Sequence, residues 1–183
     1  MVDWAFPPQY LHLTQARKGS NLFMKKLLFV LSFLVMTNPA IADSWTSSFS
    51  EEGSHQATCS STSAVSGIQC TGGYCDNISL RCGGSLGVLD DKWWTGYFSE
   101  ENGGYQPCGG KGYVVGMSCK GSYCDNIKLY CKSFRNKTPK SCGWTNWISE
   151  ENGGKLVFSS GKYAVAVKCS GSYCDNKKFY ICK

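Results

Sequence analysis

The tetrapeptide Tyr-Cys-Asp-Asn occurs three times in this sequence, beginning at Tyr74, Tyr123 and Tyr173. A tyrosine ring beside a carboxylate and an amide combines an apolar face with polar groups, and this combination suits the C–H patch and the hydroxyls of a sugar. We therefore predict carbohydrate binding near each copy. The candidate residues are Tyr74, Asp76, Asn77, Tyr123, Asp125, Asn126, Tyr173, Asp175 and Asn176.

The same tetrapeptide has the composition of a structural joint. Asp and Asn side chains cap backbone amides in tight turns. Each copy also lies in a small loop between two cysteines, and a glycine in that loop (Gly72, Gly121 or Gly171) is expected to adopt a positive φ. The two roles are compatible if the asparagine holds the turn while the tyrosine and the aspartate face solvent.

Paired glutamates form a second repeated motif, at Glu51-Glu52, Glu100-Glu101 and Glu150-Glu151. Paired carboxylates can carry out acid/base chemistry or bind Ca²⁺. Adjacent strand residues point to opposite faces, however, so we interpret these pairs as solvated loop acids, with Ca²⁺ binding as the alternative and no other metal or cofactor. After residue 42 the sequence has a single histidine, His55, and no nucleophile motif, which predicts that the protein is not an enzyme.

Residues 24–42 have the pattern of a secretory signal peptide. Two lysines precede an apolar run at 27–35, and Ala40-Ile41-Ala42 resembles a cleavage site. The apolar run is much shorter than the roughly 20 residues that cross a bilayer. We expect residues 1–23 to be untranslated or outside the fold, and the remaining chain to be secreted or periplasmic.

Charge and cysteine content restrict the function of residues 43–183. The formal net charge falls from +6 to +3 in this part, because four of the 19 basic residues and one of the 13 acidic residues lie before it. Nucleic acid is therefore excluded as the expected partner, since there is also no run of basic residues. All 12 cysteines lie in this part, and an even number in an exported chain indicates disulfides rather than zinc.

Three repeats fill this part of the chain as a single domain, at 43–92, 93–141 and 142–183. Trp45, Trp94 and Trp144 occupy the same position in each repeat, and we expect them in the core. Trp93 and Trp147 break the symmetry and are candidates for exposed stacking platforms, with core packing as the default.

Alternating apolar residues predict short antiparallel strands and an all-β fold. In the segment 113–119, positions 113, 115, 117 and 119 are expected on one face, and Ile78, Leu80 and Cys82 share a face in the same way. Three sheets of this size can close a core only by packing on one another. The last strand of the third repeat, in KKFYIC, has one additional residue, which suggests a bulge.

The positions of the cysteines in the repeats suggest one simple pairing that leaves no thiol unpaired, although sequence alone allows other connectivities. Each small loop would be closed by one disulfide, and the last strand of each repeat would be tied to an earlier segment by another. The expected pairs are Cys70–Cys75, Cys119–Cys124, Cys169–Cys174, Cys59–Cys82, Cys108–Cys131 and Cys142–Cys182.

Three segments resemble the vitelline membrane outer layer protein I family. They are CGGKGYVVGM (Cys108–Met117) with Trp94 upstream, NISLRC (Asn77–Cys82) and NIKLYC (Asn126–Cys131). The resemblance covers roughly the three repeats and implies a pseudo-threefold β-prism of three Greek-key-like antiparallel sheets with disulfides. It also implies an association with extracellular coats and an affinity for oligosaccharide. A β-trefoil is the alternative fold.

These features predict a secreted, non-catalytic binding module. Its expected partner is a glycan or glycoprotein at a cell surface or in an extracellular matrix, with no nucleic acid and no membrane span. Repeated weak sites would gain avidity from their number. One alternative is a protein-binding role, as an enzyme inhibitor or a toxin-associated subunit, and a second is a structural coat protein.

Overall fold

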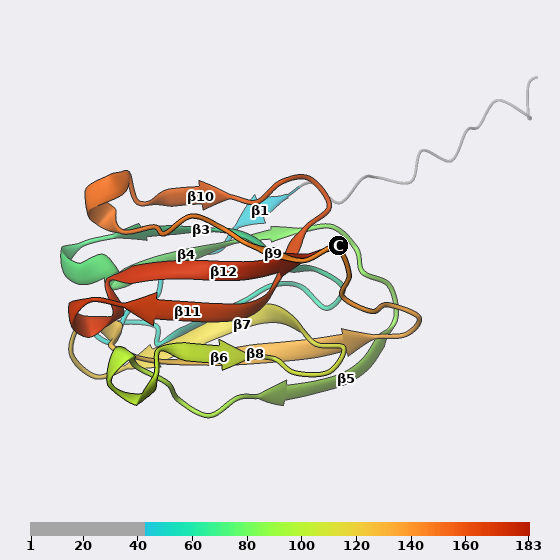
Figure 1. Ribbon diagram of the computed structural model, residues 1–183, viewed down its shortest axis with the longest axis horizontal. Coiled ribbons are helices and arrows are strands. Elements are labelled where there is room, and N and C mark those ends of the chain that lie inside the picture. The colour runs from blue at the N-terminus through green and yellow to red at the C-terminus, as the bar shows by residue number, and fades with distance from the viewer. Residues whose placement is uncertain (1–42) are drawn as a thin grey trace, which may run out of the picture. The chain divides into compact units, whose positions relative to one another are not determined.

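The computed structural model describes residues 43–183, so the predicted signal peptide lies outside the described residues. Twelve strands in this part form three four-stranded antiparallel sheets (Figure 1). This architecture confirms the all-β class and agrees with the predicted pseudo-threefold β-prism rather than the β-trefoil. Within residues 43–183, none of the helical segments is long and apolar enough to cross a membrane.

All three sheets have the same strand order, with a long central hairpin between two shorter edge strands, of which β5 is the longest. The first consists, in order, of β1 (Ser44–Trp45), β4 (Asn77–Gly83), β3 (Ala64–Thr71) and β10 (Lys155–Val157). The second consists of β2 (Gln56–Thr58), β7 (Tyr113–Lys120), β8 (Asn126–Phe134) and β5 (Leu89–Trp94). The third consists of β6 (Tyr105–Pro107), β11 (Tyr163–Ser170), β12 (Asn176–Cys182) and β9 (Gly143–Trp144).

Short 3₁₀ turns connect the strands at one end of the prism, on the left in Figure 1. They are η1 (Gly73–Cys75), η2 (Glu100–Asn102), η3 (Ser122–Cys124), η4 (Glu150–Asn152) and η5 (Ser172–Cys174). The Tyr-Cys-Asp-Asn copies begin within η1, η3 and η5, and the glutamate pairs of the second and third repeats form η2 and η4. Both repeated motifs therefore lie at the same end of the molecule.

Each repeat gives its second strand to the sheet of another repeat. Strand β2 of the first repeat pairs with β7, β6 of the second pairs with β11, and β10 of the third pairs with β3. Ala57 lies opposite Met117, and Leu156 lies opposite Ile68 at the equivalent place in the first sheet. The exchange runs from the first repeat to the second, the second to the third and the third back to the first. No repeat completes its sheet alone.

A β-bulge interrupts the alternation in β3, β7 and β11, with the register shift in β7 between Val114 and Gly116. A bulge moves the following residues to the other face of the strand. Val114 and Met117 therefore both enter the main core, whereas Tyr113 and Val115 pack in a separate cluster. The predicted common face for positions 113, 115, 117 and 119 is wrong for this reason.

The bulge predicted in the last strand of the third repeat is also wrong. Lys177 pairs with Ile148 just as Ile127 pairs with Phe98, and Cys182 lies opposite Tyr163 just as Lys132 lies opposite Tyr113. Strand β12 thus keeps the register of β8 without an inserted residue. Its cysteine is instead one position later, and Ile181 occupies the position of Cys131.

Six disulfides use all the cysteines of the described residues. They join the pairs expected from the repeats, namely Cys59–Cys82, Cys70–Cys75, Cys108–Cys131, Cys119–Cys124, Cys142–Cys182 and Cys169–Cys174. In the third repeat, Phe158 and Ile181 occupy the positions that Cys59 and Cys82 hold in the first, and both are buried in the core. An apolar pair therefore replaces one of the disulfides.

This replacement predicts that the Cys59–Cys82 bond can be exchanged for the apolar pair. Removing the bond with Cys59→Ala and Cys82→Ala should lower the free energy of unfolding by about 3 kcal/mol, because the bond closes a loop with a sequence separation of 23. Cys59→Phe with Cys82→Ile should recover part of this loss, as measured by urea unfolding. A Phe/Ile variant less stable than the double alanine variant would contradict the equivalence of the two positions.

Candidate functional site

The three Tyr-Cys-Asp-Asn copies meet at one place. The ring centroids of Tyr74, Tyr123 and Tyr173 lie 4.9–5.0 Å apart in every pair, with the rings inclined to one another. Each tyrosine remains 37–40% exposed. The candidate residues thus form a single cluster around these rings, which we name the tyrosine triad, instead of three separate sites.

The aspartate and the asparagine of each copy hold the loop together. Asn126 Nδ2 donates to Asp125 Oδ1 at 2.6 Å, and the equivalent distances are 2.8 Å in the first repeat and 2.6 Å in the third. A Cβ on Gly121, which has a φ of 79°, would lie 2.3 Å from the same Asp125 oxygen. The carboxylate therefore lies against the glycine, and the side chain that could face a ligand most freely in each copy is the tyrosine.

Tyr123 and Cys124 adopt φ values of 54° and 59°, and the same conformation recurs in the other two copies. Positive φ is unfavourable for residues other than glycine and persists only where surrounding contacts impose it. The disulfide of each loop and the Asp–Asn bond are two such contacts.

A third contact comes from the neighbouring repeat. Glu51 Oε1 accepts a hydrogen bond from the Tyr123 backbone N–H at 2.7 Å, Glu100 Oε1 from that of Tyr173 at 3.0 Å and Glu150 Oε1 from that of Tyr74 at 2.9 Å. The interpretation of these first glutamates as solvated loop acids is therefore wrong. The second glutamate of each pair is exposed. The contacts run in the same direction around the molecule as the strand exchange.

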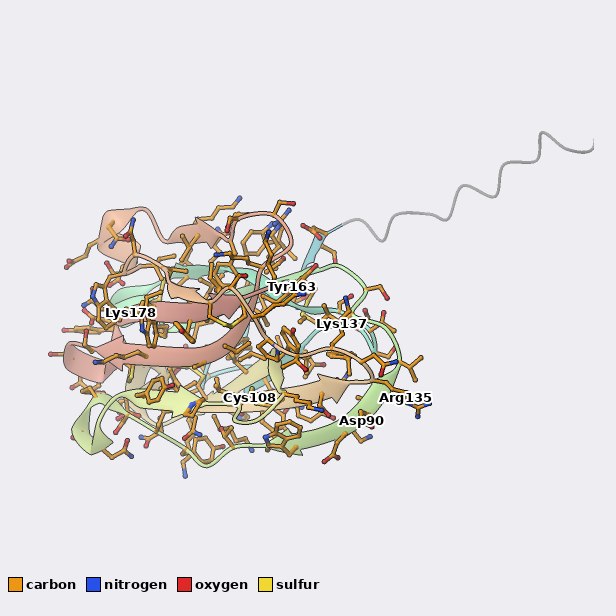
Figure 2. All side chains as sticks on the ribbon, turned by 45° about the vertical axis from the view of Figure 1, so that its right-hand side comes forward. Asp90, Cys108, Arg135, Lys137, Tyr163 and Lys178 are labelled. Atoms are coloured by element: carbon orange, nitrogen blue, oxygen red, sulfur yellow. A yellow bond between two sulfur atoms is a disulfide. The ribbon has the colours of Figure 1, made fainter. Side chains whose placement is uncertain are left out.

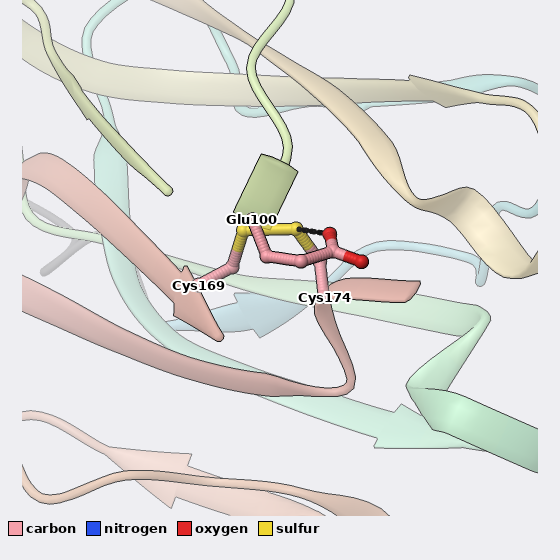
Figure 3. A group of neighbouring side chains, drawn as sticks. All are labelled: Glu100, Cys169 and Cys174. Atoms are coloured by element: carbon pink, nitrogen blue, oxygen red, sulfur yellow. Dashed lines mark hydrogen bonds between the residues drawn. A yellow bond between two sulfur atoms is a disulfide. The ribbon is translucent and has the colours of Figure 1, made fainter. Parts of the chain in front are cut away.

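One group of potential metal ligands, Glu100, Cys169 and Cys174, lies beside this contact (Figure 3). The two cysteines form a disulfide, so they offer no thiolate to a metal. Glu100 Oε2 instead contacts Cys174 Sγ at 3.2 Å. One carboxylate oxygen of the first glutamate in each pair also accepts a hydrogen bond from a backbone N–H. This bond weakens the hypothesis that the glutamate pairs bind Ca²⁺.

A buried lysine breaks the threefold symmetry near the triad. Lys177 occupies the position of Ile78 and Ile127 and is 0% exposed, and its Nζ donates to Cys174 O at 2.7 Å. Burial lowers the pKa of Lys177 from 10.5 to about 8, although nearby carboxylates, first those of Asp175 and Glu150, act to raise it. Lys177 is not among the residues predicted from the motifs, although a lysine aligned with two isoleucines is a visible signal in the sequence.

The tryptophans expected in the core lie on the outer faces of the sheets. Trp45 is 36% exposed and Trp144 is 44% exposed, while Trp94 is half-buried, so the core prediction is wrong for Trp45 and Trp144. The core is filled instead by residues four positions later, such as Phe49 and Phe98. A lysine lies over each of the three indole rings, with Nζ 4.6–5.0 Å from the centroid.

The two tryptophans that break the symmetry differ from each other. Trp93 packs against the core, and its Nε1 donates to Cys108 O at 3.2 Å, as the default of core packing predicted. Trp147 is 38% exposed, which places it among the exposed aromatic residues.

Four aromatic side chains gather on the outer face of the third sheet. The Trp144 ring centroid lies 5.9 Å from that of Tyr105 and 5.1 Å from that of Tyr180, and Lys178 Nζ lies over both Trp144 and Trp147. Tyr105 and Tyr180 line a shallow cavity of about 230 Å³. We name this surface the aromatic groove and define it by Tyr105, Trp144, Trp147 and Tyr180.

The outer faces of the first and second sheets have fewer of these aromatic residues. On the second sheet Trp94 stacks on Tyr130 with centroids 4.8 Å apart. On the first sheet Arg81 takes the position of Tyr130 and forms an ion pair with Asp43 at 2.5 Å. Lys128 Nζ also lies over Trp94 and Tyr97, just as Lys178 lies over Trp144 and Trp147. The second sheet therefore has three of the four aromatic residues and lacks only the counterpart of Tyr105, whose position is occupied by Gln56.

Comparison with known proteins gave no relative for this chain. No protein-family model, no curated protein and no solved structure matches it. The resemblance to the vitelline membrane outer layer protein I family therefore rests on the sequence motifs alone.

The glutamate contacts between repeats predict different effects for adjacent residues. Glu51→Ala should lower the free energy of unfolding by about 2 kcal/mol, because the Tyr123 backbone N–H loses its acceptor. Glu52→Ala is the matched control and should change stability by less than about 0.5 kcal/mol, because Glu52 is exposed. Urea unfolding of both variants measures the difference. Equal losses would show that the cross-repeat bond does not contribute to stability.

The Lys177→Ile variant carries the residue that the other two repeats have at this position. Because Lys177 is buried, we expect the difference in stability between the native protein and this variant to depend on pH. Below about pH 8 the lysine is charged in both folded and unfolded chains, and its burial penalty applies in full. Between about pH 8 and 10.5 only the unfolded chain keeps the proton, so the stability contributed by Lys177 rises with pH.

The isoleucine variant should therefore be the more stable protein at neutral pH. Its advantage should shrink by on the order of 3 kcal/mol across this window, as 1.4 kcal/mol per pKa unit implies. Denaturant unfolding at several pH values measures the gap, and Lys111→Ala, at an exposed lysine, is the control whose difference from the native chain should stay constant. A pH-independent gap for Lys177→Ile would contradict a buried charge.

Proposed function

We propose that this protein is a non-catalytic carbohydrate-binding module and that it binds glycans at the aromatic groove. The observation that carries the proposal is the exposure of Trp144 and Tyr105, at 44% and 46%, beside a cavity of about 230 Å³ that Tyr105 and Tyr180 line. Large aromatic side chains exposed together are unusual on a surface without a binding role.

The chemistry of the groove matches that of a sugar. The C–H bonds on one face of a pyranose ring pack against an indole or phenol ring, while its hydroxyls need hydrogen-bonding partners. Lys178, whose Nζ lies 4.6 Å from the Trp147 centroid, is positioned to donate to hydroxyls or carboxylates of a ligand on the same surface. The phenol hydroxyls of Tyr105 and Tyr180 add further polar groups at the wall of the cavity.

The aromatic groove is better supported as a sugar site than the tyrosine triad. In the triad the aspartate and asparagine of each copy already bond one another, so fewer polar groups remain for sugar hydroxyls. The three rings also pack against each other, which covers part of their faces.

The six disulfides support a location outside the reducing cytosol. Disulfides persist in oxidising compartments, and a small exported domain gains stability from them. The proposal therefore includes secretion or export to the periplasm, as the signal-like residues 24–42 also suggest. The resemblance to a family associated with extracellular coats agrees with this location.

Binding of the purified protein to a glycan array tests the proposal. We expect binding to a subset of glycans and an approximately tenfold loss of affinity in Trp144→Ala, equal to about 1.4 kcal/mol, because the ring that stacks on the sugar is removed. Trp45→Ala is the matched control, since Trp45 holds the same position on a sheet without the groove, and it should bind normally.

Other outcomes would locate the site elsewhere or reject it. If Tyr123→Ala with Asp125→Ala abolishes binding while Trp144→Ala does not, the glycan site lies at the tyrosine triad. If the native protein binds no glycan on the array, the carbohydrate-binding proposal is wrong.

A protein-binding role is the second candidate, and the tyrosine triad favours it. Three exposed tyrosines lie on a disulfide-linked frame, and the exposed glutamates Glu52, Glu101 and Glu151 each directly follow a first glutamate that bonds one of these tyrosine loops. A rigid aromatic centre with an acidic rim suits a partner surface that carries basic side chains. Capture of one specific protein that Tyr123→Ala releases, together with an empty glycan array, would favour this role.

A further inference from the structure

A cavity of about 490 Å³ shares no lining residue with the aromatic groove or the tyrosine triad, although its Lys140 and Lys183 are chain neighbours of Pro139 and Cys182, which line the cavity of the groove. Its walls include Lys137, Lys140 and Lys183, together with Tyr113 and Tyr163. Lys137 lies at the end of the molecule opposite the 3₁₀ turns (Figure 2). The volume falls within the roughly 300–1,000 Å³ of typical small-molecule sites.

Backbone bonds hold the lysines of this cavity in place. Lys140 N donates to Lys183 O at 3.1 Å, and Lys183 N donates to Lys140 O at 2.8 Å. The buried Tyr113 hydroxyl donates to the same Lys183 oxygen at 3.2 Å. Lys137 N donates to Phe134 O at 3.1 Å in a turn that follows β8. The three lysine backbones are thus anchored on the frame of the sheets.

The charged side chains that line the cavity are all lysines. Three lysines line it, and its other lining residues, Ser85, Leu86, Tyr113, Asn136, Thr138, Gly161 and Tyr163, include no acidic side chain. Asp43 contributes to the raised pKa of Tyr163, but it forms an ion pair with Arg81 and lines a neighbouring cavity.

Hydroxyl and apolar groups complement the charge. Burial and the neighbouring Asp43 raise the pKa of Tyr163, so its hydroxyl stays protonated at neutral pH and can donate. Ser85, Thr138 and Asn136 supply further polar groups. Leu86 and the Tyr113 ring belong to an apolar cluster at the cavity wall, against which an organic ring can pack.

We propose that this cavity is a second ligand site, specific for an oxyanion group carried on a small organic ring, such as a sugar sulfate or sugar phosphate. Lys137, Lys140 and Lys183 bind the oxyanion, and the hydroxyl and apolar groups contact the ring. The site is separate from the aromatic groove and does not depend on glycan binding there.

Titration calorimetry of the purified protein tests the site with four probes: N-acetylglucosamine 6-sulfate, N-acetylglucosamine 6-phosphate, N-acetylglucosamine and inorganic sulfate. We expect one or both charged sugars to bind, the neutral sugar not to bind at this cavity, and inorganic sulfate to bind at least about fivefold more weakly than the better charged sugar, because it cannot contact the apolar wall. Added salt should weaken the binding, since charge attraction contributes to it.

Lys137→Glu with Lys140→Glu should weaken binding of the charged sugar by about tenfold or more, because two cations become anions. Lys92→Glu with Lys111→Glu changes the net charge equally at exposed lysines outside the cavity and should change the affinity by less than about threefold. Trp144→Ala should leave this binding unchanged, which separates it from binding at the aromatic groove. Circular dichroism melting confirms that each variant is folded.

Three results would overturn the proposal. The first is that neither charged sugar binds the native protein at millimolar concentration. The second is an equal loss of affinity in the two double variants, which would indicate a general effect of net charge. The third is equal affinity for inorganic sulfate and the charged sugar, which would leave no role for the ring.

Discussion

Backbone pairing between repeats is the constraint on which the rest of the structure depends. Each sheet is completed by a three-residue strand from another repeat, and the first glutamate of each pair bonds the next loop in the same direction. Both kinds of contact run from the first repeat to the second, from the second to the third and from the third back to the first. These contacts alone therefore fix the three sheets relative to one another. The tyrosine triad exists because these contacts bring three equivalent loops to one axis.

The three repeats form a common pseudo-threefold frame, whereas the aromatic groove and the lysine-lined cavity depend on residues that differ between the repeats. The aromatic groove needs Tyr105 and Tyr180 beside Trp144, and the first sheet has Arg81 where the third has Tyr180. The lysine-lined cavity takes Asn136, Lys137, Thr138 and Lys140 from the segment between the second and third repeats, and its other lining residues come from the segment between the first two repeats and from the second and third repeats. A binding role at either place therefore belongs to one location on the molecule instead of three equivalent ones.

The sequence predicted those features that depend on local spacing. The six disulfide pairs followed from the cysteine positions, and the face shared by Ile78, Leu80 and Cys82 followed from a period of two. Features that depend on distant contacts could not be predicted in this way. Strand β2 is three residues without a clear pattern, and its partner β7 lies in another repeat. Trp45 appeared to be a core residue because the sequence does not show which face of an edge strand is covered.

The strand exchange also sets the order in which the protein can fold. Strand β10, which completes the first sheet, lies near the end of the chain, whereas β3, its partner, lies near the beginning of the described residues. An edge of β3 stays unpaired during synthesis until residue 157 has emerged. Contacts between such distant segments slow folding because long loops must close first. The native structure is thus the product of the whole chain, and a shortened chain that ends before β10 retains an open sheet edge.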